Sequence, residues 1–306
     1  MPETPKPFVS VIVPVYNAED MIGECIEALL AQDYPKDRYE IIIVDNDSTD
    51  GTAELIKRYP VKYLLEDEIH TSYAARNTGA RHARGEALAF CDADQIATES
   101  WLPNLLSHWH ERDKYAGFCG PYPLRPFQGS LAERYHCQES GQDAYLGEQN
   151  QEVEWWGGGN LCVDAEDFRQ IGGFPSAVAS GGDHQFTLAM SHEKGRRWLY
   201  VGGARQHHRP RSSLDALLRQ VFRLGYGYEQ RDAEFRTRTI SSCGFHLARS
   251  FVLMPLRVLN AMATPPGQDG AVRVYAAFAD PLLALADSFG RLLGYLGLPS
   301  ELASGM

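Results

Sequence analysis

The chain has 306 residues, of which 44% are hydrophobic and 23% charged, a composition that suits one large α/β domain or two small ones. Its formal net charge of −11 argues against nucleic acid as the main partner, because phosphate backbones require a basic surface. The six cysteines are scattered without a C-x-x-C pair, which argues against a zinc site or a disulfide framework and favours a reducing compartment.

The first ninety or so residues predict an alternation of strands and helices. Residues 9–15 alternate apolar side chains as a strand does, and a helix follows with Asn17 as its expected N-cap and an apolar stripe from Ile22 to Leu30. Residues 41–44 are apolar on both faces, as in a central parallel strand. The remaining predicted elements are a helix over 52–59, a strand over 61–65, a helix over 72–84 and a strand over 87–91.

This order predicts an α/β fold with a doubly wound, mostly parallel sheet flanked by helices. Ligands of such sheets bind beyond the carboxyl ends of the strands. Three polar clusters fall at those ends: Pro14 to Asn17, Asp45 to Asp50, and Asp92 to Asp94. Separate segments therefore point to one crevice.

The second half of the chain is less regular. We expect one helix over residues 98–113, a helix from the Asp164 cap to Ile171, a helix from Asp183 to about Gly195, and a helix capped by Ser212 or Ser213. From residue 241 the chain is apolar, helical in pattern and broken by prolines. Between residues 203 and 240, eight Arg face four acidic residues, which suggests a phosphate-bearing ligand or simply a solvated helix face.

The crevice needs some means of holding phosphate. The segment after the first strand is not G-x-G-x-x-G and no G-x-x-x-x-G-K-[ST] is present, which disfavours a dinucleotide dehydrogenase and excludes a P-loop enzyme. The remaining route is a metal held by carboxylates, and Asp92 and Asp94 would both face the crevice if their segment is extended. A second D-x-D at Asp45 and Asp47 shows how weak the pattern is alone, and loop-capping aspartates are the alternative.

Several short motifs together resemble one known family. The segments VIVPVYN (11–17), VDNDSTDGT (44–52), ARNTGA (75–80) and CDAD (91–94) are similar to the nucleotide-binding half of inverting family-two glycosyltransferases of the GT-A fold. The segments 159–174, Gly182-Asp183 and 208–227 resemble the acceptor half of that family. The resemblance covers roughly residues 8 to 230.

The resemblance implies roles in donor binding. Tyr16, Asn17 and Asp45 would contact the nucleoside, with the Asp45 carboxylate accepting from a uracil N–H or a ribose hydroxyl. Arg76 would lie near the base or the pyrophosphate, and Asp92 would face the ribose or the metal. Three further residues are assigned to the nucleotide-sugar site: Pro14, Gly158 and Asn160.

The resemblance also implies a metal and a base. Asp94 would bind Mn²⁺ or Mg²⁺, and Asp92 and His208 are the other candidate ligands. Asp183 would be the general base. Members commonly carry a Glu-Asp pair there, whereas this chain has Gly182-Asp183, so the base is present but a neighbouring carboxylate is missing.

Each assignment has a plainer alternative. Asp45 could cap the turn that follows it, and Asp183 could be an ordinary N-cap of the next helix. Arg76 could be a solvated helix residue, and His208 a surface histidine or a phosphate contact.

The segment 155–159 has two interpretations as well. Trp155 and Trp156 could stack on a sugar ring or pack in the core. Gly157 to Gly159 could let the backbone approach the donor sugar.

The sequence thus predicts an inverting, metal-dependent hexosyltransferase of cell-envelope polysaccharide type. It would move a sugar from a nucleotide-diphosphate donor, UDP being favoured by the resemblance, to an acceptor hydroxyl on a glycan or a lipid-linked molecule. A sugar nucleotidyltransferase and an inactive sugar-nucleotide- or glycan-binding protein are the alternatives, although the Gly-rich phosphate loop of the former is missing.

The expected organisation has three parts. Residues 1–95 form the nucleotide-sugar-binding half, 96–240 the acceptor half of the same domain, and 241–306 a helical tail. The N-terminus does not read as a signal peptide, and no uncharged apolar run approaches the ~18 residues of a spanning helix. We therefore expect a cytoplasmic protein whose tail either lies on the inner face of the cell membrane as a peripheral anchor or packs on protein.

Overall fold

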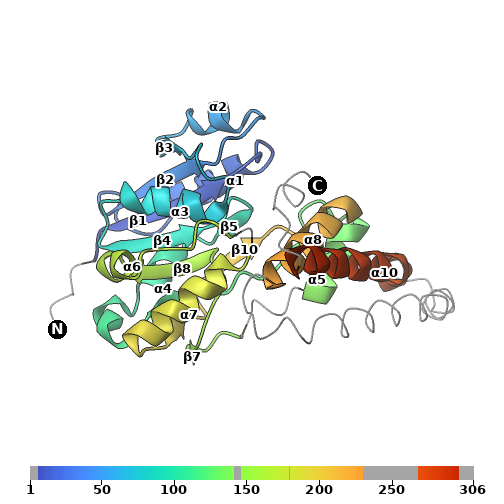
Figure 1. The fold of residues 1–306 in the computed structure, drawn as a ribbon. Helices are drawn as coiled ribbons and strands as arrows, with labels where there is room; N and C mark the ends of the chain where they lie inside the picture. Colours follow the sequence, from blue (N-terminus) through green and yellow to red (C-terminus); the bar gives the residue numbers. More distant parts are fainter. Residues whose placement is uncertain (1–5, 141–145, 179, 230–267, 296–306) are drawn as a thin grey trace. The chain divides into compact units, whose positions relative to one another are not determined.

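The computed structural model describes residues 6–140, 146–178, 180–229 and 268–295. These residues fall into two compact units. Unit 1 comprises residues 1–123, 143–177 and 182–208, and unit 2 comprises residues 124–142, 178–181 and 209–306 (Figure 1). Unit 1 contains the sheet and every residue that the sequence assigned to a site, so the function is argued from it.

An eight-stranded sheet in the order β3-β2-β1-β4-β8-β6-β9-β7 forms the centre of unit 1 (Figure 1). Its first four strands are parallel and follow the predicted order: β1 (Val9–Val15), β2 (Tyr39–Asp45), β3 (Lys62–Leu65) and β4 (Ala87–Cys91). The register pairs Val15 with Asp45, so β1 and β2 end side by side. The α/β fold with a mostly parallel sheet, expected for the GT-A type, is confirmed.

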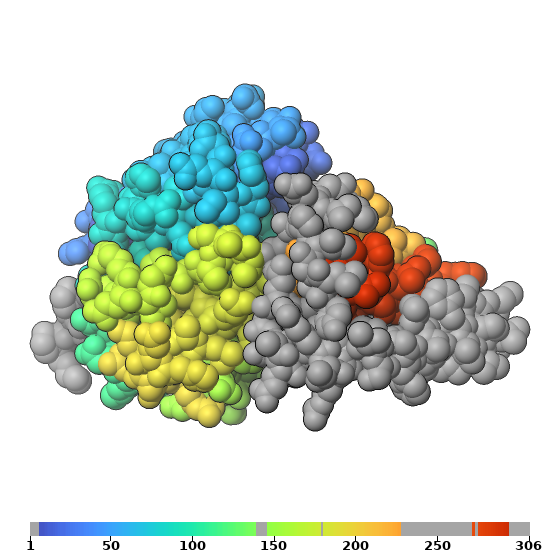
Figure 2. Space-filling view, viewed as in Figure 1, coloured from blue at the N-terminus to red at the C-terminus, as the bar shows by residue number. Residues whose placement is uncertain are grey.

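The other four strands were not foreseen as a sheet. They are β8 (Asn160–Asp164), β6 (Gly117–Cys119), β9 (Trp198–Tyr200) and β7 (Gln151–Val153). Strand β8 runs antiparallel to β4 and pairs Asn160 with Cys91. This pairing brings the segment before β8 to the carboxyl end of β4. On the surface of unit 1, the yellow-green and yellow segments accordingly abut the cyan ones (Figure 2).

Helices cover both faces of this sheet. Helices α1 (Ile22–Leu30) and α4 (Trp101–Leu105) pack on the face that presents alternate β1 residues such as Val11 and Val13. Helix α3 (Ser72–Arg81) lies on the opposite face, where a Cβ at Gly79 would stand 2.5 Å from the Ile12 side chain. Successive apolar residues of β1 therefore pack into two separate core layers, one on each face of the sheet.

The remaining short elements of unit 1 connect these layers. They are α2 (Thr52–Ile56), β5 (Gln95–Ala97), the 3₁₀ helix η1 (Trp109–Lys114), α6 (Ala165–Ile171), α7 (Gly182–Lys194) and β10 (Gln206–His208). Helix α6 is capped by the Asp164 side chain and ends at Gly172 with φ of 86°, as predicted. Strands β5 and β10 form a separate antiparallel pair.

Two local predictions were wrong. Asn17 does not cap α1, which begins at Ile22 without a side-chain cap, because the Asn17 side chain bonds to another loop. The single helix expected over residues 98–113 is broken into α4 and η1. At the break, the Ser107 hydroxyl donates to the Asn104 carbonyl (2.6 Å), a local bond that competes with helix continuation.

The described residues of unit 2 form three helices: α5 (Leu131–Ser140), α8 (Leu214–Glu229) and α10 (Gln268–Tyr295). Ala132, Leu217 and Ala279, one from each helix, share an apolar cluster. The Tyr135 hydroxyl, from α5, donates to Asp280 of α10 (2.6 Å).

The expected tail belongs to this unit, and the structure describes part of it. Residues 268–295 form α10, while 241–267 and 296–306 lie outside the described residues. None of the described helices is both long enough and apolar enough to cross a bilayer. The division of the chain at residues 95 and 240, and the membrane role of the tail, stay predictions.

Candidate active site

The loops that follow β1 and β2 are hydrogen-bonded to each other. The Asn17 side-chain oxygen accepts from the N–H of Thr49 (2.8 Å), and the N–H of Asn17 donates to the Ser48 hydroxyl (2.9 Å). Asn17 adopts φ of 46°, a left-handed conformation that Asn tolerates better than most residues. Next to it, Tyr16 is 57% exposed, while Pro14 is buried within β1. The first two predicted clusters therefore form one rim.

Asp45 ends β2 with its carboxylate almost fully buried. Its Oδ1 accepts from the N–H of Ser48 (3.0 Å) and its Oδ2 accepts from the Tyr63 hydroxyl (3.0 Å). Burial and the hydrogen bond to Asp45 raise the pKa of Tyr63 to about 12, so the phenol stays a donor at neutral pH. Asp45 thus does cap the turn, and contact with a nucleoside would use its remaining lone pairs.

Arg76 and Asp92 form an ion pair between α3 and the end of β4. Arg76 is 4% exposed, its guanidinium also donates to the Ser72 hydroxyl (3.2 Å), and it lies over the ring of Phe174. The alternative of a solvated helix residue is therefore wrong. The Arg76 Nε is buried and has no hydrogen-bond partner among the described residues. Such a donor is costly to bury without an acceptor.

Asp94 lies beside His208. Strand β5 pairs antiparallel with β10 in a register that sets Gln95 opposite His208. The Asp94 Oδ2 is 3.2 Å from the His208 Nε2, and both side chains are less than one-fifth exposed. The sequence named both residues as metal ligands, and the fold brings them together.

Asp92 and Asp94 do not lie in one extended segment, so the prediction that both carboxylates point the same way for that reason is wrong. Ala93 and Asp94 form a turn in which the N–H of Gln95 donates to the Asp92 carbonyl (3.0 Å). Asp92 consequently pairs with Arg76, and Asp94 pairs with His208. The turn separates the two carboxylates because alternate residues share a side only in a strand.

The Asp94–His208 pair can be tested against the needs of a divalent cation. A carboxylate oxygen and an imidazole nitrogen are suitable donors, and nucleotide-bound metals take one or two carboxylates plus phosphate oxygens. Within the described ranges, no group of three His, Cys, Asp or Glu side chains could hold a metal ion by itself. The pair therefore fits a cation whose other ligands come from a diphosphate.

Asp183 lies in the first turn of α7 and bonds to a distant segment. Its Oδ2 accepts from the N–H of Gly158 (3.1 Å), and its Oδ1 accepts from the N–H of His184 (3.0 Å) and the Tyr73 hydroxyl (3.4 Å). Helix α7 already includes Gly182, so Asp183 is not its N-cap residue. Burial, and then the Asp183 charge, raise the pKa of Tyr73 to about 12, which keeps the phenol protonated.

The backbone of the three glycines before β8 lies between the side chains of Asp183 and Asp92 and close to both. A Cβ at Gly158 would lie 3.1 Å from the Asp183 Cβ, and a Cβ at Gly159 would lie 2.5 Å from the Asp92 Oδ2. A Cβ at Gly157 would collide with the Tyr122 hydroxyl. The glycines therefore let the backbone approach protein side chains of the site, a close approach that only glycine permits.

Asn160 is held entirely by protein groups. Its amide nitrogen donates to the carbonyls of Pro121 (3.0 Å) and Ala204 (2.8 Å), and its oxygen accepts from the Trp101 indole (2.8 Å). The side chain is fully buried. Its expected contact with the donor stays a prediction. In the structure, its side chain links the start of β8 to Pro121, Ala204 and Trp101.

Sequence reasoning missed three tyrosines at this site: Tyr63, Tyr73 and Tyr122. Tyr73 and Tyr63 donate to the carboxylates of Asp183 and Asp45. Tyr122 is partly buried, and its ring meets that of His208 edge-on with centroids 6.2 Å apart. Burial and then the nearby Asp183 and Asp92 raise the pKa of Tyr122. Only Tyr73 carried a usable signal, since it is one helical turn before Arg76.

The predicted basic patch is divided by the fold. Arg205 belongs to unit 1 and pairs with Glu148, whereas Arg209 and Arg219 belong to unit 2. Arg209 lies over the Phe127 ring and Arg219 pairs with Asp215. Arg231, Arg236 and Arg238 lie outside the described residues.

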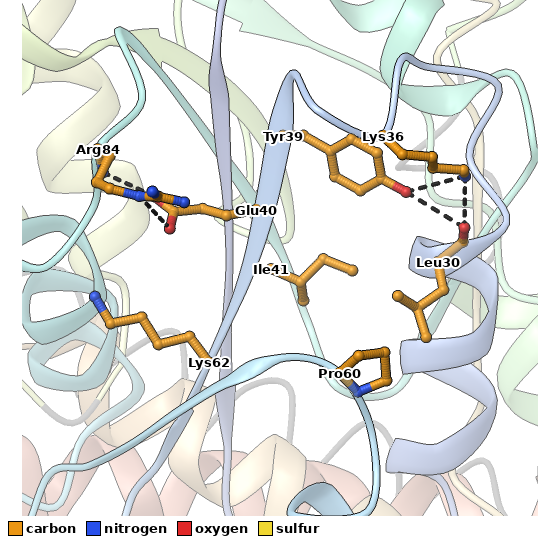
Figure 3. A pocket seen from close by; sticks show the side chains of 8 residues that line it. All are labelled: Leu30, Lys36, Tyr39, Glu40, Ile41, Pro60, Lys62 and Arg84. Atoms are coloured by element: carbon orange, nitrogen blue, oxygen red, sulfur yellow. Dashed lines mark hydrogen bonds and ion pairs between the residues drawn. The ribbon is translucent and has the colours of Figure 1, made fainter.

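A surface hollow occurs at the other end of the sheet, where β2 and β3 begin (Figure 3). Lys36 there donates to the Leu30 carbonyl, Lys62 donates to the His82 carbonyl, and Arg84 pairs with Glu40. Its cations are already bonded to protein, and parallel sheets bind ligands at the opposite, carboxyl end. We therefore place the candidate active site at the carboxyl ends of the strands.

Comparison with known proteins places this geometry in a family. Residues 10–157 match the family model described as Glycosyl transferase family 2. Glycosyltransferase AglE of Haloferax volcanii is 34% identical over 229 residues, which cover 73% of this chain and 74% of that protein.

Two solved structures share the fold. One is the mannosyltransferase PcManGT from Pyrobaculum calidifontis in complex with GDP-Man and Mn²⁺, with a TM-score of 0.59 and 23% identity over 94% of this chain and 88% of that one. The other is S. aureus TarS 1–349 in complex with UDP-GlcNAc, with a TM-score of 0.56 and 18% identity over 95% of this chain and 92% of that one.

Proposed function

The chain belongs to glycosyl transferase family 2 and is a glycosyltransferase, and on that premise we propose that it transfers a sugar from a nucleoside diphosphate to an acceptor hydroxyl with inversion. The observation that carries the proposal is the continuity of the site around Gly158 and Gly159. Gly158 bonds to Asp183, and Gly159 packs against Asp92. A candidate base and the candidate diphosphate site thus share one short segment of backbone.

The donor is proposed to be a UDP-sugar. Two proteins of the same fold hold GDP-Man and UDP-GlcNAc, which supports the class of donor but not the base. The rim that Asn17 and Asp45 build at the ends of β1 and β2 would receive the nucleoside. Arg76, with its unpartnered Nε, would stand near the diphosphate.

Asp94 and His208 would hold Mn²⁺ or Mg²⁺ together with diphosphate oxygens, with Asp92 as a further candidate ligand. When bound, the cation would stabilise the negative charge that develops on the leaving diphosphate. The Mn²⁺ in the complex of PcManGT supports this proposal, as does the closeness of the Asp94 and His208 side chains.

The reaction is proposed to be a single displacement. The acceptor oxygen forms a bond to the anomeric carbon while the bond from that carbon to the diphosphate oxygen breaks, and the hydroxyl proton passes to the Asp183 carboxylate. The N–H of Gly158 and the Tyr73 hydroxyl orient this carboxylate before the acceptor arrives. One displacement at the anomeric carbon inverts its configuration.

Calorimetric titration tests this assignment. UDP, GDP and dTDP are titrated into the protein with and without Mn²⁺, in parallel with the Asp94→Ala variant. Tight binding of one nucleotide that requires both the metal and Asp94 is the expected result. If no nucleotide binds under any condition, the donor site is wrong. Release of pyrophosphate from a nucleoside triphosphate would favour the nucleotidyltransferase alternative, and donor binding without turnover would favour an inactive binding protein.

We further propose that the acceptor is lipid-linked or part of a polysaccharide, and that α10 contacts a membrane surface. Helix α10 exposes an apolar stripe with alternating spacings of four and three residues: Phe278, Leu282, Leu285, Phe289 and Leu292. Apolar stripes of this kind lie in bilayer interfaces, although they also bind protein. The cytoplasmic location, at the inner face of the cell membrane, is part of the same proposal.

Sedimentation with anionic liposomes tests the membrane contact. The Phe278→Ser/Phe289→Ser variant should lose binding, whereas the Leu146→Ser variant, altered at an exposed leucine of unit 1, should retain it. Equal sedimentation of the two variants would contradict the membrane role, and a change in oligomeric state instead would indicate a second subunit on the stripe.

A further inference from the structure

Trp155 differs from the other tryptophans of this chain. Four of the five are buried, two of them completely, whereas Trp155 is 50% exposed. Its neighbour Trp156 is fixed in the core, because its indole donates to the Gly120 carbonyl (2.9 Å) and its N–H and carbonyl bond to Thr187 of α7. Trp155 thus projects from an anchored piece of backbone.

The position of Trp155 is tied to that of Asp183. Its ring meets the His184 ring edge-on, with centroids 4.8 Å apart and an interplanar angle of 66°. His184 directly follows Asp183, and Gly158, three residues after Trp155, donates to the Asp183 carboxylate. Thr187, which holds Trp156, is one helical turn beyond Asp183. The backbone on the C-terminal side of Trp155 is therefore bonded to Asp183 and Thr187 of α7, and the Trp155 ring contacts His184 of the same helix.

A half-exposed indole that contacts the residue next to Asp183 is suited to one kind of ligand. Tryptophan combines a broad apolar face with rigidity, so it binds flat molecules with little loss of conformational entropy. Pyranose rings have an apolar face of C–H groups and a rim of hydroxyls, whereas polyol phosphates are flexible, charged and without such a face. The apolar surface of Trp155 is therefore suited to stacking with a pyranose ring and provides no comparable contact for a polyol phosphate.

We propose that Trp155, with His184 at its edge, forms a binding platform for a pyranose acceptor, on which the ring stacks while one of its hydroxyls points to Asp183. This inference rests on the proposed function, since it takes Asp183 as the base. It adds the chemical class of the acceptor: the group that receives the sugar is itself a pyranoside rather than a polyol phosphate.

Direct binding tests the platform without any turnover. The indole N–H signals of the full chain are followed by NMR in saturating UDP and Mn²⁺, and the Trp155 signal is identified by its absence in Trp155→Phe. Methyl hexopyranosides should shift that signal, and ribitol phosphate and glycerol phosphate should not. A Trp155 signal that no pyranoside moves, or that only the polyol phosphates move, overturns the proposal.

Steady-state kinetics of Trp155 variants provide a second test of the platform. Trp155→Ala should raise the KM for a pyranoside acceptor by about five- to tenfold, while donor affinity and the slow hydrolysis of the donor by water stay unchanged. Trp155→Phe should restore most of the loss, and Leu146→Ala, a truncation at another exposed apolar residue, should behave as the wild type.

The outcomes separate this inference from the proposed function. An unchanged acceptor KM in Trp155→Ala overturns the platform, and so does a fall in donor affinity, which would put Trp155 on the donor side. A wild-type chain that binds no nucleotide sugar contradicts the proposed function instead, and the shift of the Trp155 signal by pyranosides still decides whether the platform exists.

Discussion

The His208 imidazole Nε2 lies 3.2 Å from the carboxylate of Asp94, and the contact arises from the pairing of β10 with β5. Neither residue reaches the other through local sequence. The pair unites the loop after β4, where a nucleotide is expected, with a strand near the end of unit 1.

Removal of either member should weaken the metal dependence of nucleotide binding. We expect the gain in UDP affinity on adding Mn²⁺ to be at least about tenfold smaller in Asp94→Ala and in His208→Ala than in the wild type, because the two side chains would share the cation with the diphosphate. Calorimetry with and without EDTA measures this. His110→Ala, a histidine that is more than half exposed, is the matched control. An undiminished effect of Mn²⁺ in both variants would rule the pair out as ligands.

Asp183→Asn should remove transfer and keep donor binding. We expect kcat to fall by about 10²- to 10⁴-fold, the usual contribution of a positioned base, because an amide cannot accept the hydroxyl proton. The amide oxygen can still accept from the N–H of Gly158, so the loop should stay in place. Radiolabelled transfer and nucleotide titration are measured together, with the exposed Asp113→Asn as control. Loss of donor affinity in Asp183→Asn would argue for a structural or donor-binding role.

Arg76→Met should weaken both the fold and donor binding. The change leaves the partly exposed Asp92 carboxylate unpaired, and we expect a loss of about 2–3 kcal/mol in the free energy of unfolding, somewhat less than for a fully buried pair. UDP affinity should fall with it. The double variant Arg76→Met/Asp92→Asn should recover part of the stability but not the affinity. Chemical denaturation and calorimetry measure the two effects, with the exposed Arg58→Met as control; full recovery of affinity in the double variant would contradict a role of Arg76 at the diphosphate.

Glu66 should make stability depend on pH. Burial by itself would raise the pKa of this carboxyl, but hydrogen bonds from the Thr78 hydroxyl and from the N–H groups of Ile69 and Glu68 outweigh it and hold the pKa below its usual range. A lowered pKa in the folded state stabilises the fold above the unfolded pKa of about 4.3, and this stability is lost as the pH falls through the folded value.

Glu66→Gln should therefore be less stable than the wild type by about 1–3 kcal/mol at pH 7, and the difference should shrink as the pH falls below about 4. Urea denaturation at a series of pH values measures this. The exposed Glu68→Gln serves as control and should show no such trend. A difference that grows on acidification would mean that the carboxyl is neutral in the folded protein.

Gly159→Ala should disturb the site without a change in charge. Its Cβ would lie 2.5 Å from the Asp92 Oδ2 and collide with the Gln95 amide, so we expect a loss of about 1–3 kcal/mol in stability and a clear fall in donor affinity. Gly172→Ala has open space around its Cβ but a φ of 86°, so it should lose comparable stability through backbone strain and keep its donor affinity. Equal donor affinity in the two variants would show that Gly159 is not part of the site.

The parallel half of the fold was predictable because its signals are local. Alternating valines in β1, the continuous apolar run in β2 and the turn residues between them specify strands, and the alternation of strands with helices predicts that the strands are parallel. The mixed half formed by β8, β6, β9 and β7 was not, since β6, β7 and β9 have three residues each, too few for a period to appear. The extended geometry expected for Asp92 and Asp94 also failed, because a turn there follows from the pairing of β5 with β10.

The sequence by itself determined the family, the alternation of strands β1 to β4 with helices in a parallel sheet, and the identities of the polar residues at the strand ends, since motif spacing and hydrophobic period are properties of neighbours along the chain. Only the tertiary structure decided which partners those residues take. Arg76 is buried against Asp92, Asp94 meets His208, and Trp155 stays exposed while Trp156 is buried. Each of these outcomes depends on contacts between segments far apart in the chain, and burial and electrostatic pairing are set by such contacts rather than by local spacing.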